Sequence, residues 1–302
     1  MEKQNVLITG TSSGIGRLTA QALATRGHTV FAGMRNIDGK NKEAADSLAG
    51  FAKDTPGQIH VLPMDVTSDE QVNAAVAAAL KLAGRIDVAI NSAGFGGIGW
   101  QEEFTIEEFH RVMDVFLYGA QRVYKAVLPQ MRARRAGLVI NITTIGARLA
   151  MPLRQGPYTC AKWALEALSE RYAQELEPFN IDSVTVQPGL FPGTKLLANV
   201  FYANNPEVSS GYPAYETDQY YQVWNKFRDG MLKRSDQGQT VAHLISSLIE
   251  RPAGTRPRRN VVGSNNIIGC AEAERMNSLF GEVQEHLLRV WRQGRPGDFW
   301  KD

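Results

Sequence analysis

The feature that most constrains the fold of this 302-residue chain lies at its start. It consists of a short apolar run, a glycine-rich stretch and a helical pattern, in this order. Val6-Leu7-Ile8 is long enough for a buried strand. The next residues, Thr9-Gly10-Thr11-Ser12-Ser13-Gly14-Ile15-Gly16, carry glycines spaced G-x-x-x-G-x-G, and apolar residues then recur at helical spacing. Glycines let a phosphate approach the backbone closely, and a helix N-terminus offers free amides to an anion. Three glycines alone could be a flexible turn, but the strand before them and the helix after them favour dinucleotide binding by residues 10–16.

Further strand-like runs alternate with helical patterns along the chain. We expect them at residues 29–32, 59–64, 86–90, 138–142, 183–186 and 260–263. Capping boxes, Ser68 with Gln71 and Thr105 with Glu108, predict two helix starts, and the second helix should continue to about residue 131. The alternation predicts an α/β fold over residues 1–302: one Rossmann-like domain with a doubly wound parallel sheet and helices on both faces.

Ligands of such a fold collect at the carboxyl ends of the strands. The segments that end strands here are Asp65-Val66-Thr67, Asn91-Ser92-Ala93-Gly94, Thr143-Thr144 and Pro188-Gly189. Their small residues allow a ligand to approach the backbone, so we expect the cofactor to contact Asp65, Val66, Asn91, Ala93, Gly94, Pro188 and Gly189.

Arg35 follows the second strand, where dinucleotide folds select between cofactors. An acidic residue here binds the ribose hydroxyls of NAD, whereas an arginine suits the 2′-phosphate of NADP. The chain has Arg35 and no acidic residue before Asp38, which favours NADP(H). The alternative is a solvated loop arginine.

Tyr158 and Lys162 are four residues apart and share one face if the stretch is helical. A free tyrosine has a pKa of about 10, and a nearby ammonium should pull this pKa toward working pH. Such a tyrosine can exchange a proton with an alcohol or carbonyl oxygen. Alone the pair is a weak signal, because tyrosine and lysine at this spacing are common on helix surfaces.

Composition excludes several classes of function. The net charge of +2 shows no footprint for nucleic acid or an anionic membrane, and no apolar run approaches the length of a membrane span. The five histidines show no metal-ligand spacing, so we expect no metal. Two distant cysteines and the lack of a signal-peptide core lead us to expect a reduced, cytoplasmic location.

Two segments depart from the alternating pattern. Residues 191–235 are rich in aromatic residues, which fits either a lid over the strand-end cleft or an aromatic satellite core. Near the C-terminus, within an expected helix at 271–292, one apolar stripe should dock on the chain's own domain. The stripe consists of Met276, Leu279, Phe280, Val283, Leu287 and Trp291.

These motifs together resemble the short-chain dehydrogenase/reductase family over residues 3–195. The similar segments are the glycine loop, Asn91-Ser92-Ala93-Gly94, the Tyr158/Lys162 pair and Pro188-Gly189 with Thr194. The resemblance implies that Tyr158, Lys162 and Thr144 are catalytic, and that Tyr158, Lys162, Leu190 and Thr194 also contact the cofactor. It implies an NADP-preferring reductase of bulky carbonyls, and a homodimer or homotetramer through helix pairing.

Two residues depart from the family pattern. Thr144 stands where the family has a serine, and Thr143 should point to the other side of the extended chain. Phe116 stands where similar sequences have an asparagine that relays protons through water to the lysine. A phenyl ring has no hydrogen-bonding group, so three outcomes are open: water reaches Lys162 by another route, turnover is slow, or the activity has been lost.

Two functions remain open at this point. The first is an NADP(H)-dependent oxidoreductase that transfers a hydride between the nicotinamide and a bulky, largely apolar ketone or alcohol. The second is a non-catalytic NADP-binding sensor or scaffold, which Phe116 favours and the retained Tyr158 and Lys162 oppose.

Overall fold

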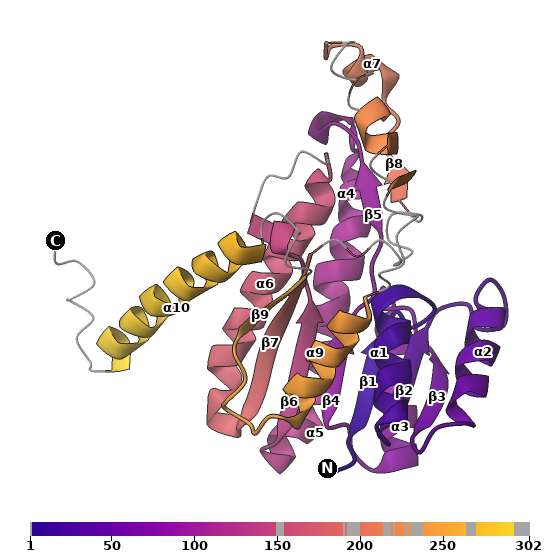
Figure 1. Ribbon diagram of the computed structural model, residues 1–302, viewed down its shortest axis with the longest axis vertical. Helices are drawn as coiled ribbons and strands as arrows, with labels where there is room; N and C mark the ends of the chain where they lie inside the picture. The colour runs from indigo at the N-terminus through magenta and orange to yellow at the C-terminus, as the bar shows by residue number, and fades with distance from the viewer. Residues whose placement is uncertain are drawn as a thin grey trace.

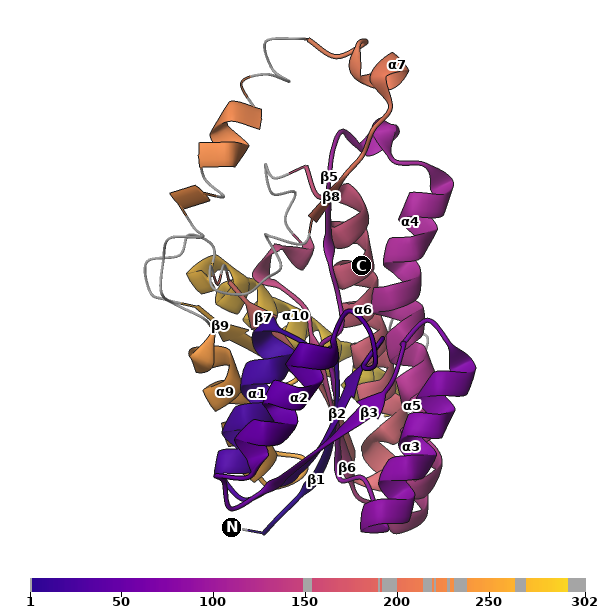
Figure 2. The same ribbon diagram turned by 90° about the vertical axis from the view of Figure 1, so that its right-hand side faces the viewer.

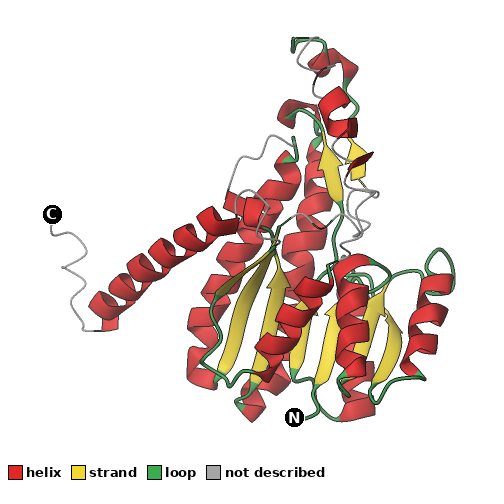
Figure 3. Ribbon diagram, in the orientation of Figure 1, coloured by secondary structure: helices red, strands yellow, loops and turns green. Residues whose placement is uncertain are grey.

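The computed structural model describes residues 2–148, 154–189, 191, 200–213, 219, 221–226, 229–230, 238–263 and 270–292 (Figure 1). Within these residues seven parallel strands form one sheet in the order β3-β2-β1-β4-β6-β7-β9 (Figure 3). The strands are β1 (Asn5–Thr9), β2 (Thr29–Met34), β3 (Gln58–Pro63), β4 (Val88–Asn91), β6 (Gly137–Ile142), β7 (Ile181–Pro188) and β9 (Arg259–Val262). The predicted parallel sheet is therefore confirmed. Its order reverses between β1 and β4, where such folds bind ligands.

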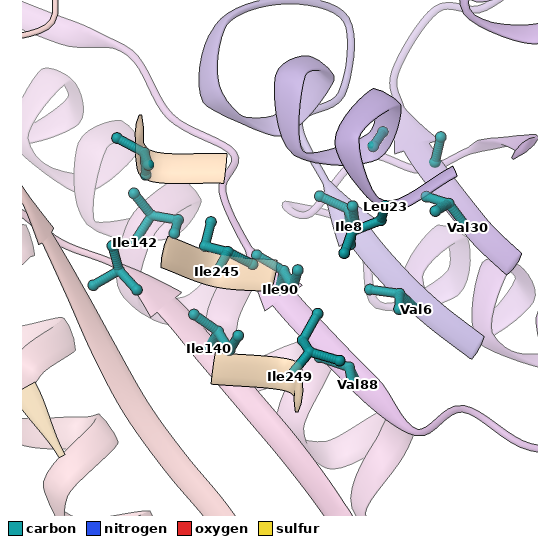
Figure 4. Packing of buried hydrophobic residues seen from close by; sticks show 14 of the residues in the cluster. Val6, Ile8, Leu23, Val30, Val88, Ile90, Ile140, Ile142, Ile245 and Ile249 are labelled. Carbon is teal, nitrogen blue, oxygen red and sulfur yellow. The ribbon is translucent and has the colours of Figure 1, made fainter. Parts of the chain in front are cut away.

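Helices cover both faces of the sheet (Figure 2). One face carries α1 (Gly14–Thr25), α2 (Lys42–Ala52) and α9 (Gln239–Glu250), and the other carries α3 (Asp69–Ala83), α5 (Gly119–Arg134) and α6 (Gly156–Leu176). Successive strand residues point to opposite faces, so β1 sends Val6 and Ile8 into the first core and Leu7 into the second. Figure 4 shows the first core, where Leu23 packs beside Ile8 and Val30, and Ile245 and Ile249 lie over Val88, Ile90, Ile140 and Ile142.

Further helical elements described over their whole length are short apart from α10. They are η1 (Gln101–Glu103), α4 (Ile106–Met113), η2 (Asp114–Tyr118), η3 (Ile145–Arg148), η4 (Glu177–Phe179), α7 (Pro206–Ser209) and α10 (Cys270–Arg292). The sequence analysis did not anticipate α2 and α9.

The two predicted capping boxes have different outcomes. Thr105 and Glu108 exchange both hydrogen bonds at the start of α4. The Ser68 side chain accepts a hydrogen bond from the Gln71 amide, but the Gln71 side chain accepts from the amide of Asp65 and not from that of Ser68. The box formed by Ser68 and Gln71 is therefore not reciprocal. The expected long helix runs through α4, η2 and α5, and η2 is a π-helical turn that the sequence did not reveal.

A second, two-stranded sheet stands beyond the carboxyl ends of the main strands. β5 (Gly96–Ile98) pairs in parallel with β8 (Val200–Tyr202), which belongs to the aromatic segment 191–235. Figures 1 and 2 place β8 and α7 at the end of the molecule to which the strands point. The described part of this segment therefore lies over the predicted cleft, and its action as a lid stays a prediction.

The prediction that the C-terminal apolar stripe docks on its own domain is wrong for most of its described side chains. Leu279, Phe280, Val283 and Leu287 are 44–62 % exposed. The helix meets the body instead through the buried Ala273, through the hydrogen bond from Asn277 to Gln187, and through the edge of the stripe at Phe280, whose ring lies against Arg148. Figure 1 shows α10 extending away from the sheet.

Candidate active site

A cleft of about 1810 Å³ follows the carboxyl ends of β1, β2, β4, β6 and β7. Most residues predicted to form the site line this cleft. They are Gly10, Ser12, Ser13, Gly14, Ile15, Gly16, Arg35, Asp65, Val66, Ala93, Gly94, Thr144, Tyr158, Lys162, Pro188 and Gly189. Leu190 and Thr194 lie outside the described residues.

Two predicted cofactor contacts lie behind the wall of the cleft. Thr11 is fully buried and fastens the glycine loop to β2 through two hydrogen bonds to the Gly33 carbonyl. Asn91 is buried beneath the cleft floor and donates to Asn141 Oδ1 at 2.8 Å. Both residues support the site rather than line it.

The glycine loop has the shape that a phosphate cradle requires. Gly10 and Gly14 have φ values of 71° and 57°, a region that favours glycine. A Cβ on Gly10 would lie 2.6 Å from Ala93 Cα, and one on Gly16 would lie 2.5 Å from the Gly10 oxygen. Helix α1 begins here with no side-chain cap and no acidic residue in its first turn, so its amides suit an anion. The loop therefore fits the pyrophosphate of a dinucleotide.

The end of the cleft at β2 is cationic. Arg17, Arg35 and Lys40 line it, with Glu43 as the one acidic neighbour on α2. The Asn41 side chain donates to the Arg35 carbonyl at 2.7 Å and fixes the turn that carries the arginine. The sequence analysis found Arg35 and missed the other two cations, because Arg17 lies in α1 and Lys40 lies in the loop before α2, away from the end of β2.

Tyr158 and Thr144 meet at the middle of the cleft. α6 places Tyr158 one turn before Lys162, and the Thr144 side chain, which also lines the cleft, interacts with the tyrosine hydroxyl and favours its charged form. Thr144 also donates to the Pro188 carbonyl at 3.3 Å and accepts from the Gly146 amide. Thr143 points away, as expected, and donates to Glu166 at 3.0 Å. Two hydroxyls thus converge where a substrate oxygen could bind.

The pKa of the tyrosine moves opposite to the direction expected from the sequence. Burial raises the pKa of Tyr158 to about 12, with the Thr144 hydrogen bond acting in the other direction. Burial also lowers the pKa of Lys162 to about 7, while Glu166 raises it. Desolvation disfavours both the phenolate form of Tyr158 and the ammonium form of Lys162. The spacing of the two residues in the sequence does not reveal how deeply they are buried. Tyr158 therefore remains protonated at neutral pH, the state of a proton donor.

Lys162 is held from three sides. It is 5 % exposed, and its Nζ donates to the Ile142 carbonyl at 2.6 Å. The Phe116 ring lies 4.2 Å from Nζ, and the Tyr158 ring lies 5.6 Å from it. An aromatic face attracts a cation, so Phe116 favours the ammonium form that burial disfavours.

Phe116 is seated on Gly94. It belongs to the π turn η2, is 3 % exposed, and meets the Tyr158 ring edge to face at 5.5 Å. A Cβ on Gly94 would lie 2.2 Å from Phe116 Cε1, so the ring fits because residue 94 has no side chain. Phe95 and Phe201 continue the aromatic contacts toward the mouth of the cleft.

The described residues contain no group of three or more histidine, cysteine, aspartate or glutamate side chains that could hold a metal ion. Among the helices that the structure describes, none is long and apolar enough to cross a membrane.

Comparison with known proteins gives consistent results. The family model described as short chain dehydrogenase matches residues 4–205. A 3-ketodihydrosphingosine reductase of Bacteroides thetaiotaomicron is 39 % identical over 209 residues, 69 % of each chain. Human retinol dehydrogenase 8 is 34 % identical over 296 residues, 94 % of this chain and 90 % of the relative.

Solved structures agree with these sequence relatives. A short-chain dehydrogenase from Streptomyces avermitilis superposes with a TM-score of 0.72 at 28 % identity, and covers all of both chains. An alcohol dehydrogenase from Thermococcus sibiricus complexed with 5-hydroxy-NADP gives a TM-score of 0.65 at 25 % identity, over 87 % of this chain and 97 % of that one.

Gly94→Ala tests the seat of Phe116. We expect the added methyl group to lower the free energy of unfolding by about 1–3 kcal/mol, because it overpacks a buried ring. Gly50→Ala is the control: no atom lies within 4 Å of its Cβ position inside α2, and it should raise stability by about 0.5–1 kcal/mol. Urea unfolding measures both. In a Phe116→Leu background, Gly94→Ala should lower the free energy of unfolding by less than it does in the wild-type chain. If the effects of the two substitutions on this free energy are strictly additive, residue 94 and the ring of residue 116 are not in contact.

Proposed function

We propose that this chain, which belongs to the short-chain dehydrogenase family, transfers a hydride between NADP(H) and a bulky, largely apolar ketone or alcohol. The observation that carries the proposal is the meeting of Thr144 and Tyr158 in the strand-end cleft, beside the buried Lys162. The oxidoreductase class follows from the family. The cofactor type and the substrate type are our proposals.

Several observations support a nicotinamide dinucleotide in the cleft. The loop glycines leave room for its phosphates, and the uncapped start of α1 offers them amides. Arg35, with Arg17 and Lys40 nearby, supports the 2′-phosphate of NADP. When bound, this cofactor supplies or accepts the hydride.

The chain's own residues handle the substrate oxygen and the proton. Thr144 and Tyr158 hold a carbonyl oxygen through their hydroxyls. During reduction the carbonyl carbon receives the hydride and Tyr158 gives its proton to the oxygen, which yields the alcohol. The Lys162 ammonium stabilises the phenolate that remains, because opposite charges attract strongly in a buried site. Oxidation reverses these transfers.

The wall of the cleft supports an apolar substrate. Phe95, Phe116, Phe191, Val200 and Phe201 line it. Apolar walls with a few convergent polar groups are typical of small-molecule sites. The relatives named for retinol and 3-ketodihydrosphingosine agree with this preference, since both molecules are mostly hydrocarbon.

Phe116 supports a second candidate, a non-catalytic NADP-binding sensor or scaffold. Its ring occupies the space beside Lys162 and offers no hydrogen bond to a relay water.

We further propose that the chain forms a homodimer or homotetramer, for which the exposed Trp163 and Cys160 on α6 provide a surface. We also propose a cytoplasmic location, which fits the two free cysteines.

NADPH consumption with a panel of ketones tests the catalytic proposal. Bulky alicyclic and aromatic ketones should be reduced faster than acetone. Tyr158→Phe should bind NADPH normally and lose about 10²-fold or more in kcat/KM, because it keeps the ring and lacks the proton. No turnover with any ketone or alcohol, together with tight NADPH binding, would favour the sensor.

Arg35→Ala tests the cofactor preference. Charge-assisted hydrogen bonds contribute about 1.5–3 kcal/mol each, so NADPH should bind at least about tenfold more weakly while NADH binding stays nearly unchanged. Fluorescence titration measures both dissociation constants. Lys42→Ala is the control, since Lys42 pairs with Asp46 and does not line the cleft. Equal losses for NADPH and NADH would contradict this assignment.

A further inference from the structure

A buried carboxylate lies one helical turn beyond Lys162. Glu166 is 1 % exposed on the same face of α6. Its Oε1 accepts from Thr143 at 3.0 Å and from Gln187 Nε2 at 2.6 Å, and its Oε2 lies 2.8 Å from Arg148. The sequence analysis did not single out this residue, because one glutamate in a helix has no visible signature.

The three partners of Glu166 come from the elements that build the active site. Thr143 precedes Thr144 at the end of β6, Gln187 precedes Pro188 in β7, and Arg148 ends η3. The Glu166 carboxylate therefore connects the ends of β6 and β7 to α6. These two strand ends hold the Thr144 hydroxyl, and α6 carries Tyr158 and Lys162. A buried carboxylate is strongly destabilising when it loses its partners, so this geometry is held tightly.

Helix α10 closes the network from outside. Asn277 accepts from Arg148 and donates to Gln187 at 2.6 Å. The Phe280 ring lies 4.3 Å from the Arg148 guanidinium carbon and 5.4 Å from that of Arg259. Two side chains of α10 thus cover the arginine that pairs with Glu166.

We propose that Glu166 is a positioning residue that holds its carboxylate one helical turn from Lys162 and aligns the Thr143–Thr144 strand end, and that α10 shields it through Asn277 and Phe280. The inference rests on the proposed hydride-transfer function. It adds to that function a link between the C-terminal helix and the reacting hydroxyls.

The charges around Lys162 support this role. Burial lowers its pKa, and Glu166 is the charge that raises it. The other groups that face the lysine are the neutral Tyr158 phenol and the Phe116 ring. Around Glu166 stand Arg148 on η3, Glu170 on α6 and Arg259 on β9, and Glu170 pairs with both arginines. A neutral side chain at position 166 removes the carboxylate charge that raises the pKa of Lys162.

Glu166→Gln, with Glu170→Gln as its matched control, tests the proposal through activity. Both variants remove a partner of Arg148, but Glu170 lies two turns from Lys162. We expect Glu166→Gln to lower kcat about tenfold with a smaller change in KM, and to move the alkaline loss of kcat/KM about one pH unit lower. Glu170→Gln should leave the pH profile in place.

A second measurement needs neither cofactor nor activity. The pKa of Lys162 is about 7 in the folded chain and about 10.5 when unfolded, so its burial destabilises the fold fully below pH 7 and less as pH rises toward 10. Removing the Glu166 charge lowers the folded pKa further. The Tm deficit of Glu166→Gln should therefore be larger at pH 6 than at pH 9, whereas that of Glu170→Gln should not change with pH.

Milder variants on α10 cover the case in which Glu166→Gln does not fold. Phe280→Ala should shift the alkaline limb in the same direction by a smaller amount, and Leu279→Ala, its neighbour on the exposed side, should not. An unshifted profile and a pH-independent Tm deficit in Glu166→Gln would overturn the proposal, as would equal shifts in Glu170→Gln. If the wild-type chain reduces no ketone, the proposed function fails, and the Tm measurement still decides the link between Glu166 and Lys162.

Discussion

The structure depends on one buried positive charge. Removing an ammonium group from water costs several kcal/mol even in a relaxed protein interior, and Lys162 is 5 % exposed. The Ile142 carbonyl, the Phe116 ring and the Glu166 carboxylate offset part of this cost from three different elements. The end of β6, the π turn η2 and α6 therefore have to meet at fixed distances, and the meeting point is where Thr144 and Tyr158 face the cleft. The burial of the Lys162 charge beside Tyr158 therefore lowers the free energy of unfolding.

Phe116 holds that charge in a different way from the asparagine that the family resemblance leads one to expect at its position. An aromatic ring stabilises the ammonium by its face but cannot accept or relay a proton. The π turn carries the ring on the helix that faces α6, and the missing side chain of Gly94 makes room for it. Protons that reach Tyr158 in this chain have to follow a route without a side-chain partner at position 116.

The sequence predicted the elements whose signals are local. The glycine loop, the alternation of strands and helices and the helical spacing of Tyr158 and Lys162 depend on neighbouring residues, and the structure contains all three. Quantities set by packing were missed. The pKa of Tyr158 rises because apolar atoms enclose the phenol, Asn91 turns toward Asn141 beneath the floor, and the partners of Glu166 come from β6, β7 and η3. The stripe on α10 was misread because periodicity shows an apolar face without showing what covers it.

The central claim is that the charge of Lys162 serves catalysis and costs stability, and Lys162→Met tests it most directly. Methionine keeps the length and burial of the side chain without the charge, while Glu166 keeps Arg148, Thr143 and Gln187 as partners. Replacing a buried charge by an apolar side chain is often neutral or stabilising. One preparation should be compared with wild type for Tm at pH 7 and for NADPH-dependent ketone reduction. The account predicts an unchanged or higher Tm with at least about 10²-fold slower reduction; a clearly lower Tm with reduction at the wild-type rate would contradict it.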